Sequence, residues 1–214
     1  MTICDKCVIL LLSRASGERC LKCSKKINIS GIIKKVNCCD LCDKLHFDKA
    51  MSFCTYEGLA RKIVLAIKND NTLHAKTIAM LLYGKFKSTL TDEETVITIV
   101  PSSQKTTRSR MYNQLSLIAN HLKKIDKNLT IKNTLLKKTR ETPKQSSLSQ
   151  KARSKNLKNA FNVHDIQCVQ KFNKFIIIDD VMTTGSTFSE VAKTIKAKNP
   201  LAEVICISFC STEF

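Results

Sequence analysis

Tryptophan is absent from this sequence, and glycine and proline are scarce, with five and three residues. The scarcity of glycine and proline excludes collagen-like and low-complexity chains. Acidic residues are also few, because 18 Asp and Glu stand against 36 Lys and Arg, which gives a net charge of +18. So large an excess of positive charge predicts a polyanionic partner: a nucleic acid, a phosphorylated ligand or an anionic membrane face.

Long apolar runs are missing as well. The strongest one near the start covers residues 8–12, which is far shorter than the roughly 20 residues that a membrane-spanning helix needs. No basic segment followed by a long apolar stretch opens the chain, so we expect no secretory signal. The 214 residues are 43% apolar and 25% charged, which is typical of a soluble globular protein. We therefore expect an intracellular protein without a membrane span.

Cysteine is abundant and unevenly placed. Eight of the eleven cysteines precede residue 55. The remaining three stand in apolar surroundings and are expected to be small buried side chains: Cys168, Cys206 and Cys210. The early group contains three C-x-x-C pairs, and two such pairs complete a tetrahedral zinc shell.

The spacing of these pairs leaves more than one zinc shell open. The first is a zinc-ribbon spacing formed by Cys4, Cys7, Cys20 and Cys23. The alternative joins the second pair to the third, with Cys38 as a spare: Cys20, Cys23, Cys39 and Cys42. Disulfides or free thiols are the remaining interpretation. About 50 residues bury little apolar area, so a zinc ion here is expected to be structural.

After residue 56 the pattern changes to alternating helices and strands. Helical periodicity predicts helices over residues 59–68, 73–86 (ending near Gly84), 112–122 and 190–197. Short apolar, β-branched runs predict strands over residues 95–100, 129–136, 175–178 and 203–209. Strands that are apolar on both faces indicate an α/β fold with a largely parallel sheet and flanking helices. We predict two domains: a small zinc-ribbon-like module over residues 1–50 and an α/β domain over residues 51–214.

The segment FIIIDDVMTTGST, residues 175–187, carries the clearest chemical signal. An apolar strand leads into Asp179 and Asp180, which can accept hydrogen bonds from sugar hydroxyls or hold a divalent ion. A hydroxyl-rich turn follows, and a helix begins, whose first N–H groups favour an anion. Gly185 would let the backbone approach a phosphate closely. A helix cap that follows an acidic strand end is the competing interpretation, but the combination of four apolar residues, two Asp and TTGST favours the phosphate loop.

This segment resembles the 5-phosphoribosyl-1-pyrophosphate (PRPP) motif of type I phosphoribosyltransferases. The resemblance implies that Asp179 and Asp180 act in catalysis by contacting the ribose hydroxyls. It also implies a loop around the 5-phosphate: Val181, Met182, Thr183, Thr184, Gly185, Ser186 and Thr187. The pyrophosphate and Mg²⁺ would lie at a second loop, after the first core strand. Its candidates are Pro101, Ser102, Ser103, Arg108 and Arg110.

Three further segments are similar to motifs of the ComF family, the competence protein F family. Its V-P…R…R-G-F-N-Q segment is matched, with Met111 and Tyr112 replacing Gly and Phe, by Val100, Pro101, Arg108, Arg110, Asn113 and Gln114. Its R-x-T-x-x-Q-x-x-L-x-x-x-x-R segment is matched by Arg140, Thr142, Gln145, Leu148 and Arg153. Its Y-E-G…L-K helix is matched by Tyr56, Glu57, Gly58 and Lys68. The C-x-x-C pairs also fit this family, so the resemblance covers nearly the whole chain.

The resemblance implies a PRPP-binding protein of natural competence, active in the cytoplasm where single-stranded DNA enters. Competence DNA-translocation proteins are then candidate partners. One hypothesis is an enzyme that transfers ribose 5-phosphate from PRPP to an unknown acceptor. The segment around Arg140, Gln145 and Arg153 would then be a flap over the site. The sequence leaves open whether turnover occurs.

The rival hypothesis is a protein that senses PRPP or a nucleotide and binds single-stranded DNA without catalysis. Residues 103–158 contain fifteen Lys or Arg and two acidic residues, which marks one electropositive segment. Base stacking would be weak without Trp. Phe47, Phe53 and Tyr112 are candidate platforms, although core packing or local structure is the better interpretation of each. A nucleotide-salvage phosphoribosyltransferase is a third, less attractive alternative.

Overall fold

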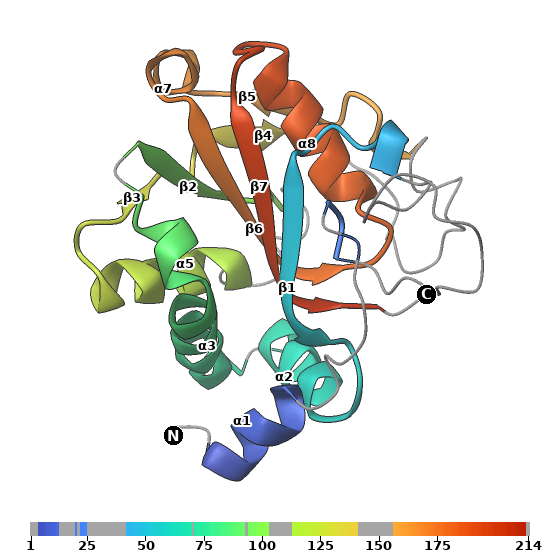
Figure 1. Ribbon diagram of the computed structural model, residues 1–214, viewed down its shortest axis with the longest axis vertical. Coiled ribbons are helices and arrows are strands. Elements are labelled where there is room, and N and C mark those ends of the chain that lie inside the picture. The colour runs from blue at the N-terminus through green and yellow to red at the C-terminus, as the bar shows by residue number, and fades with distance from the viewer. Residues whose placement is uncertain are drawn as a thin grey trace.

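A computed structural model shows an α/β protein (Figure 1). It describes residues 4–12, 20, 22–24, 42–69, 71–92, 94–102, 113–140 and 156–212. In chain order its elements are α1 (Asp5–Leu12), η2 (Cys42–Lys44), β1 (Lys49–Thr55), α2 (Gly58–Lys68), α3 (Leu73–Leu90), β2 (Thr95–Ile99), α5 (Gln114–Ile125), β3 (Thr130–Ile131), β4 (Leu136–Lys138), β5 (Phe161–Val163), α7 (Ile166–Lys171), β6 (Lys174–Met182), α8 (Ser186–Lys196) and β7 (Glu203–Ser211).

The centre of the protein is a five-stranded sheet in the order β1-β7-β6-β2-β3. Every neighbouring pair in it is parallel. The inner strands are buried because they are apolar on both faces: β2 buries all five of its residues, and β7 exposes only Glu203. The predicted α/β fold with a largely parallel sheet is confirmed.

Helices cover both faces of this sheet. Figure 1 shows α3 and α5 on one side of the sheet and α8 on the other. The arrangement follows from right-handed crossovers, because β2 leads to β3 in one direction and β6 leads to β7 in the opposite direction. The helix predicted over residues 112–122 corresponds to α5, which buries Leu115, Ile118, Ala119 and Leu122.

Two predicted elements differ in their ends. The helix expected to end near Gly84 continues as α3 to Leu90, with a kink at Phe86. A Cβ at Gly84 would meet nothing within 4 Å, so this glycine sits on an open helix surface. There it costs only about 1 kcal/mol of helix propensity, which burial of Phe86 and Leu90 offsets.

The strand expected over residues 129–136 is two strands in different sheets. β3 joins the large sheet beside β2, and β4 pairs antiparallel with β5. A turn separates them, closed by the hydrogen bond from Leu135 N to Lys132 O at 3.2 Å. The prediction of one strand over residues 129–136 is therefore wrong, because the chain changes direction between Lys132 and Leu135.

The N-terminal part of the chain joins the same fold. Helix α1 packs against α2 and β1, and β1 pairs with β7 as an edge strand. The predicted division into residues 1–50 and 51–214 stays a prediction. Among the described residues, no helix has the length and apolar character needed to cross a bilayer.

Candidate functional site

The two carboxylates of the predicted site lie at the end of β6. Asp180 is buried, and its Oδ2 lies 2.8 Å from Lys68 Nζ at the end of α2. Gln114 Nε2, at the start of α5, lies 3.4 Å from the same oxygen. Asp179 Oδ1 accepts a hydrogen bond of 2.8 Å from the Asp180 backbone N–H. Three elements thus converge on the acidic pair.

The proximity of these charges changes how they titrate. Removal from water, and then the negative charge of Asp180, raise the pKa of Asp179 from an ordinary 3.8 to about 7. Burial opposes the charge of Lys68, but Asp180 and Asp179 together outweigh this effect and raise the pKa of Lys68. Near neutral pH the site therefore holds a fixed ion pair beside a carboxyl group that is close to half protonated.

The loop after the acidic pair is compact. Gly185 has φ +76° and forms the cap of α8, without a side-chain cap bond. Thr184 is buried, its Oγ1 lies 2.7 Å from Ser186 Oγ, and it accepts a hydrogen bond of 3.3 Å from Ser186 N. Val181, Thr183 and Thr187 are half-buried, and Met182 is buried. The left-handed turn at Gly185 directs the chain into α8 immediately after two hydroxyl groups.

The neighbouring strand end also belongs to this edge. β2 and β6 are paired through Ile99 and Ile178, and Val100 N donates to Ile178 O at 3.0 Å. Pro101 and Ser102, which follow, are half-buried beside the end of β6. The chain order reverses between these two strands, and ligands of open α/β sheets bind outside the strand ends at such a switch point.

Several predicted site residues lie outside the described residues: Ser103, Arg108, Arg110, Gln145 and Arg153. Arg140 is described, and it is exposed at the end of β4. Its Nη2 donates to the carbonyl oxygens of Asn156 at 2.7 Å and Lys158 at 2.9 Å. Arg140 thus joins two chain segments that stand on either side of residues 141–155.

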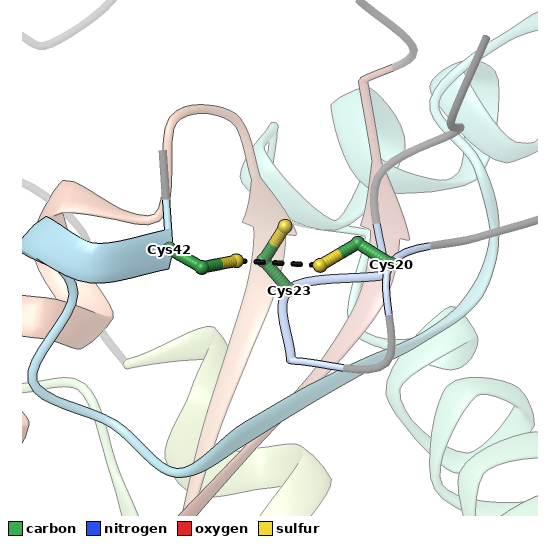
Figure 2. A group of neighbouring side chains, drawn as sticks. All are labelled: Cys20, Cys23 and Cys42. Carbon is green, nitrogen blue, oxygen red and sulfur yellow. Dashed lines mark hydrogen bonds between the residues drawn. The ribbon is translucent and has the colours of Figure 1, made fainter. Parts of the chain in front are cut away.

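Three cysteines gather in a buried group: Cys20, Cys23 and Cys42 (Figure 2). Their sulfur atoms lie within 4.8 Å of one another, and the Sγ atoms of Cys20 and Cys42 are 3.3 Å apart. Sulfur atoms on a tetrahedral zinc ion with Zn–S bonds of about 2.3 Å stand about 3.8 Å apart. The donor set therefore fits three corners of a zinc site.

All three members of this group belong to the alternative predicted ligand set, whereas the first predicted set shares only Cys20 and Cys23 with it. Cys4 and Cys7 form a separate pair, with their Sγ atoms 3.4 Å apart, and Cys39 lies outside the described residues. The three late cysteines are buried, as expected from their surroundings: Cys168, Cys206 and Cys210. Burial raises the pKa of each of these three thiols, which disfavours the reactive thiolate.

Comparisons with known proteins agree with the motifs. Competence protein F of Haemophilus influenzae is 35% identical over 88 residues, which cover 41% of this chain and 38% of that protein. DNA utilization protein YhgH of Escherichia coli strain K12 is 39% identical over 75 residues, or 35% of this chain and 31% of that protein. The matches support a ComF family assignment. The matched part spans about a third of the length of these relatives, and no protein-family model matches the chain.

Two residues of the ComF-like motifs have a position at the site that sequence reasoning did not assign. Lys68 closes the Y-E-G…L-K helix, and Gln114 follows the helix cap Asn113. Both reach Asp180, across 112 and 66 positions of sequence. Their place in the motifs was the available signal, since no local pattern links a helix end to a distant strand end.

Proposed function

We propose that the edge formed by the ends of β2 and β6 binds PRPP or a related phosphoribosyl ligand, and that the protein acts in competence and DNA uptake. One observation carries the first part: the acidic pair, the Ser/Thr loop and a left-handed glycine stand together at the switch point of a parallel sheet. The names of the two relatives, with their matches, support the second part.

The residues of the site suit the separate parts of such a ligand. Backbone N–H groups at the start of α8 and the hydroxyls of Thr184 and Ser186 would hold the 5-phosphate. Asp179 and Asp180 would accept hydrogen bonds from the ribose hydroxyls. Lys68 pairs with Asp180 at 2.8 Å and places a cation at the site. In an enzyme, the carboxylate oxygens of Asp179 and Asp180 would stabilise the positive ribosyl centre that develops as pyrophosphate leaves. Mg²⁺, expected with PRPP, stays a prediction.

The cysteine group is proposed to hold a structural zinc ion. Cys20, Cys23 and Cys42 supply three thiolates, and the nearest other cysteines in sequence are Cys38 and Cys39. A shell of four thiolates leaves no open position for a substrate, so the metal would contribute folding energy rather than chemistry.

A second function, binding of single-stranded DNA, is favoured by the charge of three neighbouring helices, since α3 packs against both α2 and α5. Helices α2, α3 and α5 carry eight Lys or Arg and no Asp or Glu. Such a surface neutralises a phosphate backbone without reading its sequence. DNA binding can accompany the PRPP site, either in a transferase or in a protein that senses PRPP without turnover.

Calorimetry with PRPP and with ribose 5-phosphate tests the primary proposal. Thr184→Val removes a loop hydroxyl and keeps the side-chain volume, so it should weaken binding of both ligands. Thr194→Val is the matched control, because Thr194 lies in α8, the helix that follows the loop, and its hydroxyl donates to Glu190 O at 2.8 Å, away from the loop. Equal affinity of both variants and the parent would refute the site. Pyrophosphate release from PRPP then separates an enzyme from a sensor.

A further inference from the structure

The segment of residues 42–48, here called the bridging segment, contacts both the cysteine group and the loop of the proposed ligand site. It begins with Cys42 of the group. Five positions later, the ring of Phe47 lies under the loop: a Cβ placed on Gly185 would stand 3.4 Å from Phe47 Cε1. Phe47 also packs edge-on against Phe188 of α8, with ring centroids 6.5 Å apart. Phe47 is 1% exposed, so the contact is part of the core rather than a surface touch.

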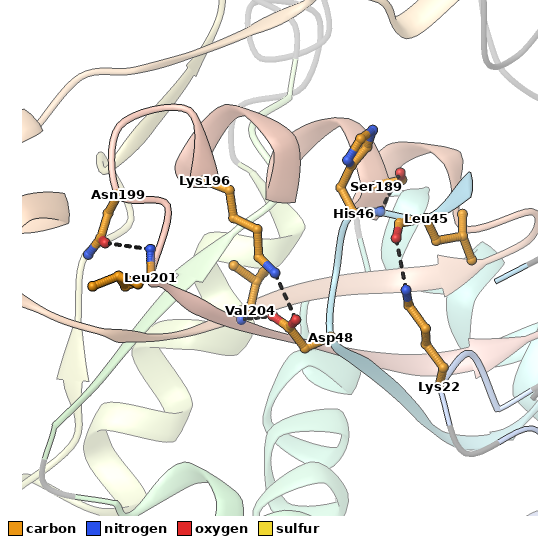
Figure 3. A network of polar contacts seen from close by, with 9 residues as sticks. All are labelled: Lys22, Leu45, His46, Asp48, Ser189, Lys196, Asn199, Leu201 and Val204. Atoms are coloured by element: carbon orange, nitrogen blue, oxygen red, sulfur yellow. Dashed lines mark hydrogen bonds and ion pairs between the residues drawn. The ribbon is translucent and has the colours of Figure 1, made fainter. Parts of the chain in front are cut away.

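Polar contacts fix the bridging segment to α8 and β7 (Figure 3). His46 N donates to Ser189 Oγ at 3.1 Å. Asp48 accepts from Val204 N and pairs with Lys196 Nζ, both at 2.7 Å. These bonds hold the backbone on both sides of Phe47, so the ring has little freedom to move independently of its segment.

The Cys20–Cys23 turn is hydrogen-bonded to the bridging segment and to the residue pair that follows it. Lys22 lies inside this turn, and its Nζ donates to Leu45 O at 3.0 Å (Figure 3). Its carbonyl oxygen accepts from Ala50 N at 2.6 Å, just beyond the bridging segment. Ser24 Oγ donates to Ala50 O. The cysteine turn is therefore fastened to the chain on both sides of Phe47.

We propose that the cysteine group sets the shape of the ligand loop, with Leu45 and Phe47 as positioning residues between them. This inference rests on the proposed function for the meaning of the loop, but the mechanical link is independent of any ligand. Gly185 has no side chain, so the loop backbone rests directly on the Phe47 ring. Leu45 Cδ1 stands 3.9 Å from the same Cβ position. A close-packed contact of this kind transmits a displacement instead of absorbing it.

Metal binding supplies order that a short segment with a small core lacks. With a metal on Cys20, Cys23 and Cys42, the bridging segment is held at its first residue and Phe47 stays under Gly185. Without the metal, the segment loses its anchor at Cys42 and is held by its polar bonds and by the packing of Phe47 on Phe188. The loop is then free to leave the conformation in which Gly185 rests on Phe47. Metal-free protein is therefore expected to bind phosphoribosyl ligands weakly while the central sheet remains folded.

The test compares full-length protein with zinc and after chelation, and adds Phe47→Ala. Hydrogen exchange is read at Ser189 N, which donates to Gly185 O at 2.8 Å, and at Ser186 N in the loop. Chelation and Phe47→Ala should each speed exchange at both amides about tenfold or more. Each should weaken ribose 5-phosphate binding by a similar factor. Phe47→Ala should retain its zinc, which places the ring between the metal and the loop.

Phe53→Ala is the matched control. Phe53 is also buried, at 3% exposure, and stacks on Phe209 of β7. It should lower overall stability without selectively loosening the loop amides. Chelation should not speed amide exchange further in Phe47→Ala, since metal removal and the substitution act through the same contact.

Unchanged exchange at Ser186 and Ser189 after chelation would overturn the inference, whatever the ligand data show. If the parent protein binds neither PRPP nor ribose 5-phosphate, the proposed function fails. The exchange measurement still decides whether the cysteine group controls the loop.

Discussion

Asp179 should make the protein less stable as the pH rises through neutrality. The pKa of its carboxyl is about 7 in the folded protein and near 3.8 in the unfolded chain. The unfolded chain therefore loses this proton at lower pH than the folded protein does. An acid whose pKa is raised by folding lowers stability above its unfolded pKa, and the loss is complete above its folded pKa. The loss of stability therefore develops between about pH 4 and pH 7, the pKa values of the unfolded and the folded state.

The size of the effect follows from the shift. Each pK unit corresponds to about 1.36 kcal/mol, so a shift of about three units sets an upper limit near 4 kcal/mol above pH 8. Asp179 is half-buried, and water around it reduces this value to about 1–3 kcal/mol. Asp179→Asn removes the charge but keeps an oxygen for the Asp180 N–H. Its free energy of unfolding should exceed that of the parent at pH 8 and converge toward it as the pH falls to 5.

Urea unfolding of both proteins at half-unit pH steps gives the difference curve. Histidines and other titrating groups common to both proteins largely cancel in that difference. Asp180→Asn is the informative partner variant, because it leaves Lys68 without its 2.8 Å ion pair and should destabilise the protein by about 1–3 kcal/mol at pH 8. The two neighbouring substitutions thus have opposite signs. A difference curve for Asp179→Asn that is flat from pH 5 to 8 would refute the reasoning.

Three other predictions test the remaining parts of the site. Lys68→Met should weaken ribose 5-phosphate binding about tenfold, because Asp180 loses its cation. Lys68→Arg should keep part of the affinity. Equal calorimetric affinities of the parent and Lys68→Met would contradict this prediction. Cys42→Ser should lose zinc in metal analysis while Cys7→Ser retains it, and the reverse result would restore the first predicted ligand set. Single-strand DNA affinity should fall by about 0.7 log units per phosphate contact per decade of salt. The affinity should also fall in a variant with Lys124, Lys127 and Lys137 all reversed to Glu. An unchanged affinity would show that another surface binds the DNA.

Lys123 is left out of this charge reversal for a structural reason. Its Nζ donates to the carbonyl oxygens of Lys127 at 2.7 Å and Leu129 at 2.6 Å, and so holds the turn after α5. Replacing it would disturb the fold near β3 as well as the charge. The three chosen lysines are exposed, so their reversal changes the surface field with less effect on packing.

The sequence predicted the centre of the fold well, because local pattern and burial agree there. The run at residues 175–178 is apolar on both faces, and β6 places it between β2 and β7 with all four residues buried. Parallel strands end at the same edge, so locating β6 also located the loop that follows it. Residues 49–55 were not predicted as a strand, since KAMSFCT neither alternates nor forms a pure apolar run. Its burial in β1 is correspondingly mixed.

The charges at the site could not be predicted to the same degree. The contact between Lys68 and Asp180 depends on how α2 packs against the sheet, which no spacing within either segment specifies. The cysteine pairs show the same limit: C-x-x-C spacing identifies a metal-binding pair, but the path of the chain decides which pairs meet. Here that path brings Cys42 to Cys20 and Cys23.

Phe47 lies between the cysteine group and the proposed ligand loop. Its sequence context suggested core packing, and the ring is indeed buried, but the core it enters lies beneath the proposed ligand loop. A loop that must present several N–H groups to one anion gains from a rigid support, because each donor has to be held within a fraction of an ångström. β6 fixes where the loop starts, and α8 fixes where it ends. The left-handed turn at Gly185 lies between them with no side chain of its own, so Phe47 and Leu45 supply the packing from below. The cysteine group is then best understood as the anchor of that support.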